Sequence, residues 1–598
     1  MAAPLGMWGV LAAVVLLPWA VLAVDPGGFQ PMGPVKFLAV GTVLVGAARA
    51  LFRRGRLPGV GQLVPAPWVW AALLGWMAVT TATGEVWRWG LTGSPSRVMG
   101  LLGWLLFPVA VLVGIAVGRD RDLRRLFVRS LAVAGIVVSG YALIQVVGLD
   151  PVDIGGGAGS DRARSLLGNA SFLAAHLTLV VPMAVGVLLA DPAAGWRRVG
   201  GAGAVLGLAA AVASQSRGGL LGLAAGVLVL VAMPGMAPWR RHLRRPVVAV
   251  PIGVLLVGLA VAAAPRIAEL DATGTVRGRA VLWSSSVELI ADSPVLGHGP
   301  ETFRLVAPAT FSDADAREIG VETVADRAHQ PVLDIGVGSG VPGMAAYLVL
   351  LVLLARALVA AVRTDPDPLV AGAAAAVVGY LVQLQVSISV AWLDVLMWVL
   401  VGVAVAGAGA VVASRPRGSA YHGPLAAWTA LFVLVSGWGL SGVLADRSSA
   451  VTSEHLTAGR LDEAAAVGER AATWGLWRAE YEQVATRAAL APAVDGLEMG
   501  GRVEVHLARA ERHATRAVEL SGGDPAYLLD LGDVLAAVVL YTSDLDDARR
   551  VEAAFEAVVA AAPGDPRGWA GLAEVRRLLG DEAGAAESRA RADALASE

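Results

Sequence analysis

The chain has 598 residues, of which 56% are hydrophobic and 16% are charged, and its mean hydropathy is +0.64. In soluble domains about a quarter of the residues are charged, so this composition predicts a polytopic membrane protein. A net charge of −2 gives no overall basic surface for nucleic acid, and the absence of cysteine excludes disulfides, thiolate nucleophiles and cysteine-bound metals.

Thirteen apolar segments approach the roughly 20 residues that cross a bilayer as a helix. The first has no basic N-terminal flank and further spans follow it, so we expect a retained helix and not a cleaved signal peptide. The expected fold is therefore all-α, a membrane bundle of about 12–13 spans. The segments are 7–24, 35–52, 67–84, 98–118, 127–148, 172–190, 199–215, 218–235, 246–264, 341–362, 369–391, 392–413 and 425–444.

Arginines gather in the short connections that follow every second span. If the spans alternate, all these connections share one side, which the positive-inside rule makes cytoplasmic. The long polar loop at 265–340 and everything after Asp446 then lie outside. The arginines are Arg53, Arg54, Arg56, Arg119, Arg121, Arg124, Arg125, Arg197, Arg198, Arg240, Arg241, Arg244, Arg245, Arg363, Arg415 and Arg417.

The C-terminal region, 446–598, differs in composition from the membrane domain, 1–445. It is charged, rich in alanine and helical in period, and Asp-Pro pairs at 524 and 565 favour helix starts. Its segments resemble degenerate tetratricopeptide repeats, which predicts an α-solenoid. Because stacked helix pairs usually form binding surfaces, we expect an extracytoplasmic docking domain for protein partners.

The polar loop contains the residues of a folded cap. Trp283, Pro294, Gly297, Gly299 and Phe303 argue against disorder in a connection of this length.

Two arginines open an apolar period that predicts a short amphipathic helix in this loop. They are Arg277 and Arg279, and paired guanidinium groups bind phosphate oxygens without a metal. The alternative is a solvated loop arginine paired with Asp271 or Glu288.

Arg217 follows Ser214-Gln215-Ser216 at the start of a predicted span and precedes two glycines. An arginine at that depth normally faces a cavity or a partner, and the glycines allow close approach of another backbone or a ligand. The alternative is an arginine that snorkels to the interface.

His329 lies just before the span at 341–362 and is the candidate general base, with Asp326 or Asp334 to orient it. His298 and His176 are weaker candidates, and a plain interfacial histidine is the alternative.

Three further cations are expected to face outward and bind substrate: Lys36, Arg97 and Arg164. For Lys36 and Arg97 the alternative is an interfacial anchor. Asn169 heads an N-x-S pattern, which we interpret as local hydrogen bonding.

No Walker lysine motif, H-E-x-x-H or G-x-S-x-G pattern is present, which argues against ATP hydrolysis, zinc peptidase and serine hydrolase chemistry. No tight carboxylate pair stands out in an outer loop, so metal-free chemistry without a cofactor is favoured.

Three motifs in order resemble the O-antigen ligase and O-antigen polymerase superfamily. They are SRGGLLGL at 216–223, GRAVLWSSSVELIADSPVLGHGPETF at 278–303 and AHQPVLDIGVGSGVPG at 328–343, with support from YALIQVVGLDP and RARSLLGNASFLAAH upstream. The resemblance covers about 1–414. Gln330 departs from it, because asparagine is common beside the histidine.

This resemblance implies a glycosyltransferase of the integral-membrane C type. Arg217 and Arg279 would match the family's essential arginines, with Arg277 less certain, and His329 its essential histidine. A polyprenyl-pyrophosphate-linked glycan would be transferred with inversion to a hydroxyl of an acceptor glycan, lipid or protein.

The abundance of alanine, glycine and arginine with one lysine favours a high-GC bacterial genome, hence the bacterial cytoplasmic membrane with its lipids. Ligase and polymerase remain open alternatives, and the runner-up is a non-enzymatic polysaccharide or lipid transporter or assembly scaffold.

Overall fold

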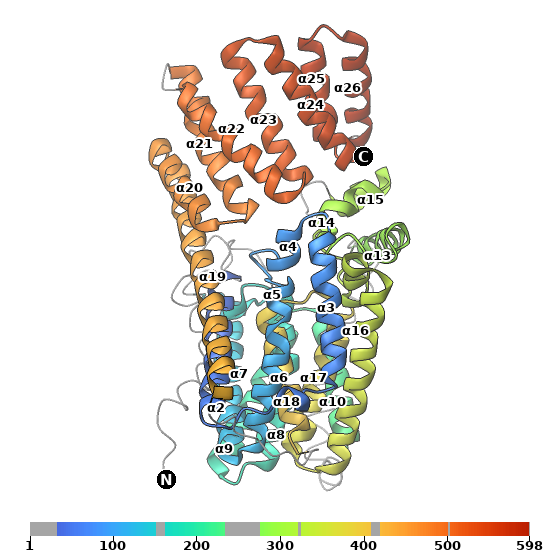
Figure 1. Ribbon diagram of the computed structural model, residues 1–598, viewed down its shortest axis with the longest axis vertical. Coiled ribbons are helices and arrows are strands. Elements are labelled where there is room, and N and C mark those ends of the chain that lie inside the picture. The colour runs from blue at the N-terminus through green and yellow to red at the C-terminus, as the bar shows by residue number, and fades with distance from the viewer. Residues whose placement is uncertain are drawn as a thin grey trace.

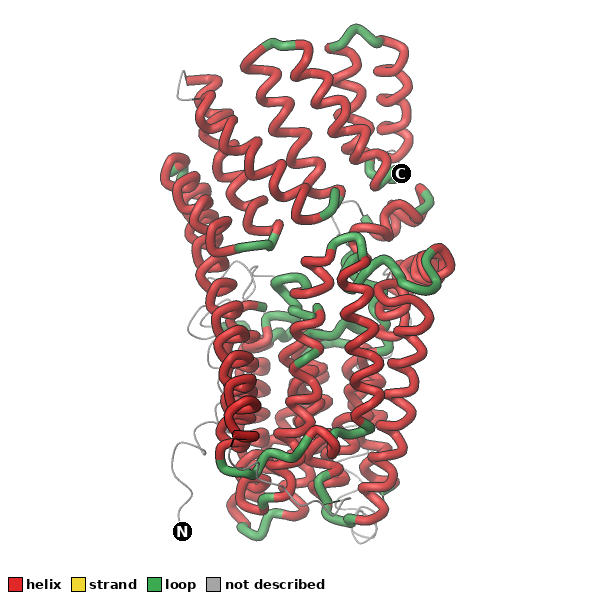
Figure 2. The backbone as a smooth tube through the Cα atoms, viewed as in Figure 1, coloured by secondary structure: helices red, strands yellow, loops and turns green. Residues whose placement is uncertain are grey.

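The computed structural model describes residues 33–150, 162–233, 275–320, 325–407, 419–499 and 503–596. Within these ranges every regular element is a helix, which agrees with the predicted class. Figures 1 and 2 show a helical bundle with a second group of helices stacked on one end. The predicted spans 7–24 and 246–264, and the arginines at 240–245, 415 and 417, lie outside the described residues.

Each of the other eleven predicted spans corresponds to helix. The elements of the bundle are α2 (Pro34–Arg53), α3 (Pro67–Thr83), α5 (Leu101–Trp104), α6 (Leu106–Arg119), α7 (Arg121–Val146), α8 (Ala170–Ala190), α9 (Ala194–Ala213), α10 (Arg217–Ala232), α16 (Pro331–Thr364), α17 (Pro368–Leu384), α18 (Ala391–Val405) and α19 (Ser419–Thr457).

By length and composition, seven helices in the described ranges are able to cross a membrane: α2, α5 with α6, α7, α8, α16, α19 and α23 (Pro525–Thr542). The last of these lies among the C-terminal helices and packs on its neighbours there, outside the bundle (Figure 1). The shorter apolar helices α10, α17 and α18 complete the bundle. The chain is therefore a polytopic helical membrane protein.

The arginine-rich connections meet at one end of the bundle. Arg56 pairs with Asp120 at 2.8 Å, and Arg124 pairs with Asp367 at 3.2 Å, so the α2–α3, α6–α7 and α16–α17 connections touch. If successive spans alternate in direction, these connections must all lie at the same end of the bundle. We call the other end the cap end.

Small residues set the spacing inside the bundle. A methyl group added to Gly219 of α10 would overlap Ala174 of α8, and one added to Gly222 would strike Gly379 of α17. Close backbone approach of this kind drives helix association in lipid, where burial of apolar surface gives no advantage.

Helix α16 starts ten residues earlier than its predicted span and is interrupted. Gly340 has φ 64° and ψ −173°, and Pro342 lacks an N–H, so the helical ladder fails here. The 294–299 turn supplies the missing partners: Val341 N donates to Pro294 O at 2.8 Å, and His298 N donates to Val337 O at 2.9 Å. The break therefore fastens the loop to the bundle.

The cap comprises the described residues 275–320 and 325–330 at this end. Its elements are α13 (Thr275–Asp292), α14 (Phe303–Val306), η4 (Ala307–Thr310) and α15 (Asp313–Ile319). Helix α13 confirms the helix that the sequence predicts here, although Val287 of its expected apolar face is 60% exposed. Leu282, Leu289, Phe303, Ala307 and Ala328 form the buried core of the cap.

The C-terminal array comprises α20 (Leu461–Gly475), α21 (Ala479–Met499), α22 (Val503–Ser521), α23, α24 (Leu545–Ala561), α25 (Pro566–Leu578) and α26 (Glu582–Ala596). Asp524 and Asp565 cap α23 and α25 ahead of a proline, which confirms the predicted helix starts. The predicted boundary at 445/446 falls inside α19, which runs unbroken from the bundle into the array (Figure 1). The tetratricopeptide character of the array stays a prediction.

Gly219→Ala should destabilise the bundle by about 1–3 kcal/mol, because the added methyl group overpacks the α8–α10 contact. Gly75→Ala in α3 is the matched control, since nothing lies within 4 Å of its added Cβ. Thermal unfolding of both variants in one detergent checks this, and equal midpoints would contradict the packing account.

Candidate functional site

Arg217 is the first residue of α10 and follows a tight turn from α9. Gln215 has a φ of 52°, and the Ser216 hydroxyl caps the helix by accepting from Gly219 N at 3.4 Å. The 162–168 segment packs on this turn, because Ala163 N donates to Ala213 O at 3.0 Å and Arg162 donates to Ser214 O at 3.1 Å. The turn thus holds Arg217 half-buried at the cap end.

Arg279 lies on α13 and is also half-buried. Burial lowers the pKa of Arg279, and the positive charge of Arg217 lowers it further. The structure therefore brings together two arginines that are 62 positions apart in the sequence. Arg277, two residues earlier, has a side chain 76% exposed and reaches Glu318 at 3.7 Å, so it does not join them.

His329 sits in a short segment that is fixed on both sides. Its own φ is 57°, an uncommon conformation for a residue with a side chain. On one side, the Trp283 indole donates to Ala328 O at 3.0 Å, and Ala328 N donates to the Asp334 carboxylate at 2.7 Å. On the other side, the Gln330 side chain caps α16 by accepting from Leu333 N at 2.7 Å.

Gln330, which stands where asparagine is common in the family that the sequence resembles, has a local structural role. Its carbonyl oxygen acts as a helix cap, a role in which asparagine is also effective. Its amide donates to Gln385 of the α17 end at 3.0 Å.

Cations surround His329. Burial lowers its pKa to about 4; Asp326 opposes this shift, while Arg97, Arg279 and Arg327 add to it. The imidazole is consequently neutral at neutral pH and able to accept a proton. The charge of Arg279 thus acts on His329, and the charge of Arg217 acts on Arg279. A single site made of all three residues stays a prediction.

Two ion pairs hold the segment around His329. Arg97 reaches Asp326 at 2.5 Å, and Arg327 pairs with Glu301. Both arginines are largely buried. Asp326 therefore anchors Arg97, whose pKa is lowered by burial and raised by that carboxylate.

The sequence alone does not single out Arg327 and Glu301. Arg327 stands two residues before the histidine, and Glu301 follows the Gly-Pro of the cap turn with a φ of 68°. Proximity to the motif was the available signal, but their pairing depends on the fold.

Lys36 and Arg164 both lie at the short segment 164–167. Lys36 is fully buried at the start of α2; its amine donates to Leu167 O at 3.4 Å and lies 4.2 Å from the centre of the Trp392 ring. Arg164 immediately precedes η2 (Ser165–Leu167), which carries that carbonyl. The burial of Lys36 and of Arg97 contradicts the alternative of exposed interfacial anchors.

The other histidines lie elsewhere. His176 is buried within α8, and its surroundings include Lys36. His298 lies in the cap turn, where its ring is 3.2 Å from Leu289 O. Asn169 caps α8 through Ser171 N at 2.8 Å, which confirms the predicted local hydrogen bonding.

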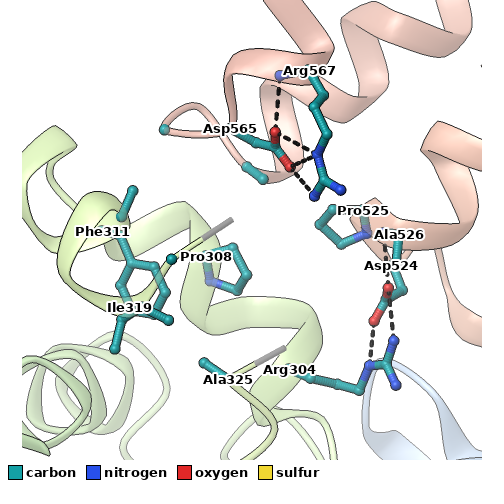
Figure 3. Close-up of a pocket in the computed structure, with 14 residues that line it drawn as sticks. Arg304, Pro308, Phe311, Ile319, Ala325, Asp524, Pro525, Ala526, Asp565 and Arg567 are labelled. Carbon is teal, nitrogen blue, oxygen red and sulfur yellow. Dashed lines mark hydrogen bonds and ion pairs between the residues drawn. The ribbon is translucent and has the colours of Figure 1, made fainter. Parts of the chain in front are cut away.

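The C-terminal array packs on the cap (Figure 3). Arg304 of α14 donates to Asp524 through two bonds of 2.6 and 3.1 Å, next to Trp89 and Tyr527. Burial disfavours the charge of Arg304, but Asp524 more than offsets it, so the pKa of Arg304 is raised. A cleft of about 100 Å³ beside this pair is lined by Pro308, Phe311 and Ile319 of the cap, among others.

A second contact lies at the far end of the array. Arg591 of α26 donates to Asp313 of α15 at 2.7 and 2.8 Å, and this pair is more exposed than the first. The array thus grips the cap, which carries His329, at two points.

Among the described residues, no group of three or more histidine and acidic side chains is arranged to hold a metal ion.

These features define a helical membrane protein with a cationic site between the bundle and a cap. The family model described as O-Antigen ligase matches residues 202–348, a range that contains Arg217, Arg279 and His329. A search of curated proteins finds no match to the chain. The family match supports the O-antigen ligase superfamily, a glycosyltransferase-like membrane enzyme of cell-surface polysaccharide assembly, and lipid-linked glycan substrates.

Asp524→Asn should weaken the contact between the array and the cap by up to about 3–5 kcal/mol, because it removes the carboxylate bound to the buried Arg304 and leaves Glu480 to offset that charge. Asparagine still caps α23, so the loss reports the charge alone. Hydrogen exchange of residues 303–320 in the full chain measures it.

Asp313→Asn is the control, because an exposed pair contributes about 0–1 kcal/mol. Equal acceleration of exchange in both variants would contradict the assignment of the main contact to Arg304 and Asp524.

Proposed function

We propose that the protein transfers a glycan from a polyprenyl pyrophosphate donor to an acceptor hydroxyl, at a site formed by Arg217, Arg279 and His329. The observation that carries this proposal is the position of Arg279 on the cap, where it lies close enough to feel the charge of Arg217 and to act on His329. The family match over the same residues supports it.

The two arginines would bind the diphosphate. Guanidinium groups match phosphate oxygens with paired donors. As the bond between C1 of the sugar and the diphosphate oxygen breaks, negative charge grows on the leaving polyprenyl pyrophosphate. Fixed cations then stabilise the transition state more than the bound donor, which is the condition for catalysis. The charge can be met without a divalent metal.

His329 would act as the base. A neutral imidazole nitrogen takes the proton of the acceptor hydroxyl while its oxygen bonds to C1 on the face opposite the leaving group. One transfer of this kind inverts C1. Arg97–Asp326 and Arg327–Glu301 would hold the base in place without touching the substrate.

The cap end would face outward. The arginine-rich connections at the other end favour the cytoplasmic side by the positive-inside rule. The donor would then enter from the outer leaflet of a bacterial cytoplasmic membrane, and the array would lie outside, where it is available to protein partners.

Arg164 would extend the phosphate-binding surface from the bundle side. Lys36 is fully buried and donates to Leu167 O, so it would support that segment without contacting the donor. Arg277, whose exposed side chain lies near Glu318, would stay outside the site. The acceptor decides between ligase and polymerase. Loss of a polymerase leaves single lipid-linked repeat units, whereas loss of a ligase leaves unattached polymer, so the polysaccharide of a deletion strain separates them.

Arg217→Ala and Arg279→Ala should each lower the rate of glycan transfer by about 10²–10³, because one charge-stabilising donor is lost. Transfer from a defined polyprenyl-pyrophosphate oligosaccharide by purified protein measures this. Arg317→Ala, an exposed arginine of the same cap, is the control and should keep the wild-type rate. Wild-type transfer by either site variant would overturn the proposal and favour a scaffold or transporter.

The acid limb of the pH profile should differ between the free and donor-bound enzyme. Because His329 has a pKa of about 4 in the free protein, kcat/KM should hold down to that region and fall below it. A bound diphosphate stabilises the imidazolium and raises this pKa, so kcat should fall at a higher pH. Coincident limbs would contradict the role of His329 next to the diphosphate.

A further inference from the structure

Exposed apolar side chains gather where α20 turns into α21. Trp474, Leu476 and Trp477 are each nearly half exposed, and Leu476 holds a φ of 55°. Trp87, at the start of α4 (Trp87–Thr92), is similarly exposed, and its ring centre lies 5.9 Å from that of Trp477. We call these four residues the aromatic turn. Its amount of exposed ring surface is unusual for a water-facing domain.

The aromatic turn is fixed against α19 at a defined height. Arg478 donates to Trp438 O at 3.2 Å and its guanidinium lies 3.8 Å from the centre of the Trp438 ring. The Tyr481 hydroxyl reaches Gly442 O at 3.5 Å. These contacts hold the α20–α21 turn at the level of residues 438–442.

The length of α2 places the membrane boundary at the cap end at this level. Gly442 lies against Pro34, the first residue of α2, and Gly439 lies against Leu38. Helix α2 has 20 residues and ends at Arg53, so it is about 30 Å long, the thickness of the hydrocarbon core. With Arg53 at one boundary, Pro34 and the aromatic turn are at the other.

The aromatic turn also continues a lipid-facing surface. Below it, α19 exposes Val433 and Leu434, and at its level Leu440, as expected of a spanning helix in contact with acyl chains. Between Leu434 and Leu440 on the same helix comes Trp438, whose ring centre lies 6.0 Å from that of Trp477. The apolar strip therefore passes from α19 onto the array without interruption.

We propose that the aromatic turn inserts into the headgroup region of the leaflet at the cap end and anchors the C-terminal array to the bilayer. Tryptophan prefers this region, because its ring is apolar while its indole N–H bonds to headgroups or water. Arg88, whose guanidinium lies 4.9 Å from the centre of the Trp87 ring, places a cation at the depth of the lipid phosphates. A protein partner would have to displace lipid to reach this surface.

The anchor would set the height of the array above the membrane. The array holds the cap through Asp524, so a fixed array keeps the cap at a fixed distance from the bilayer. This inference does not rest on the glycan transfer proposed above.

Spin labels on the full chain in liposomes test the anchor, and the natural absence of cysteine makes every introduced thiol unique. Labels at Trp474→Cys and Leu476→Cys probe the turn. Val433→Cys on α19 is the reference for lipid, and Leu540→Cys, 75% exposed near the far end of α23 from Asp524, is the reference for water.

The measurement is the accessibility of each label to oxygen, which partitions into lipid, and to a water-soluble nickel chelate. We expect both turn labels to lie between the two references and to be shielded from the chelate relative to Leu540→Cys. Turn labels as accessible to the chelate as the label at 540 would overturn the proposal. Leu476 has no aromatic ring and takes no part in the ring contacts of the turn. The label at Leu476→Cys therefore still measures the depth of the turn if replacement of Trp474 disturbs folding.

Discussion

Repulsion between Arg217 and Arg279 is the constraint around which the cap end is built. Burial and the charge of Arg217 lower the pKa of Arg279, and two such cations remain close only when the backbone around them is held. The α9–α10 turn fixes one of them, and α13, packed in the cap core, fixes the other. An anion bound between the two arginines would relieve this repulsion, which agrees with the diphosphate donor proposed above.

The cap keeps its arrangement through contacts that are distant in sequence. Asp524 reaches Arg304 across 220 positions, and Glu301, three residues earlier, pairs with Arg327 beside the histidine. A short covalent path thus joins the array contact to the segment that carries His329. The array is therefore a structural support of the site, in addition to the docking domain that its repeats predict.

Period and composition predicted most of the bundle, because lipid demands long apolar helices whatever their packing. The described spans and the amphipathic α13 followed from that rule. The break at Gly340 did not, although Pro342 signalled it, because its stabilisation comes from the 294–299 turn far away in the sequence. The burial of Lys36 was missed for the same reason: an apolar flank looks alike whether it faces lipid or protein. The sequence predicts which charged residues are candidates for the site. That Arg277 points away from it follows only from the fold.

The low pKa of His329 adds a consequence for the order of events in the proposed reaction. An imidazole with a pKa near 4 is a weak base, since proton affinity and basic strength fall together. Arg97, Arg279 and Arg327 impose part of that weakness, and a diphosphate bound to the arginines would cancel some of their field. The base would then gain strength when the donor is in place. Activation of a hydroxyl, whether of the acceptor or of water, would thereby be linked to the presence of the glycan that it attacks.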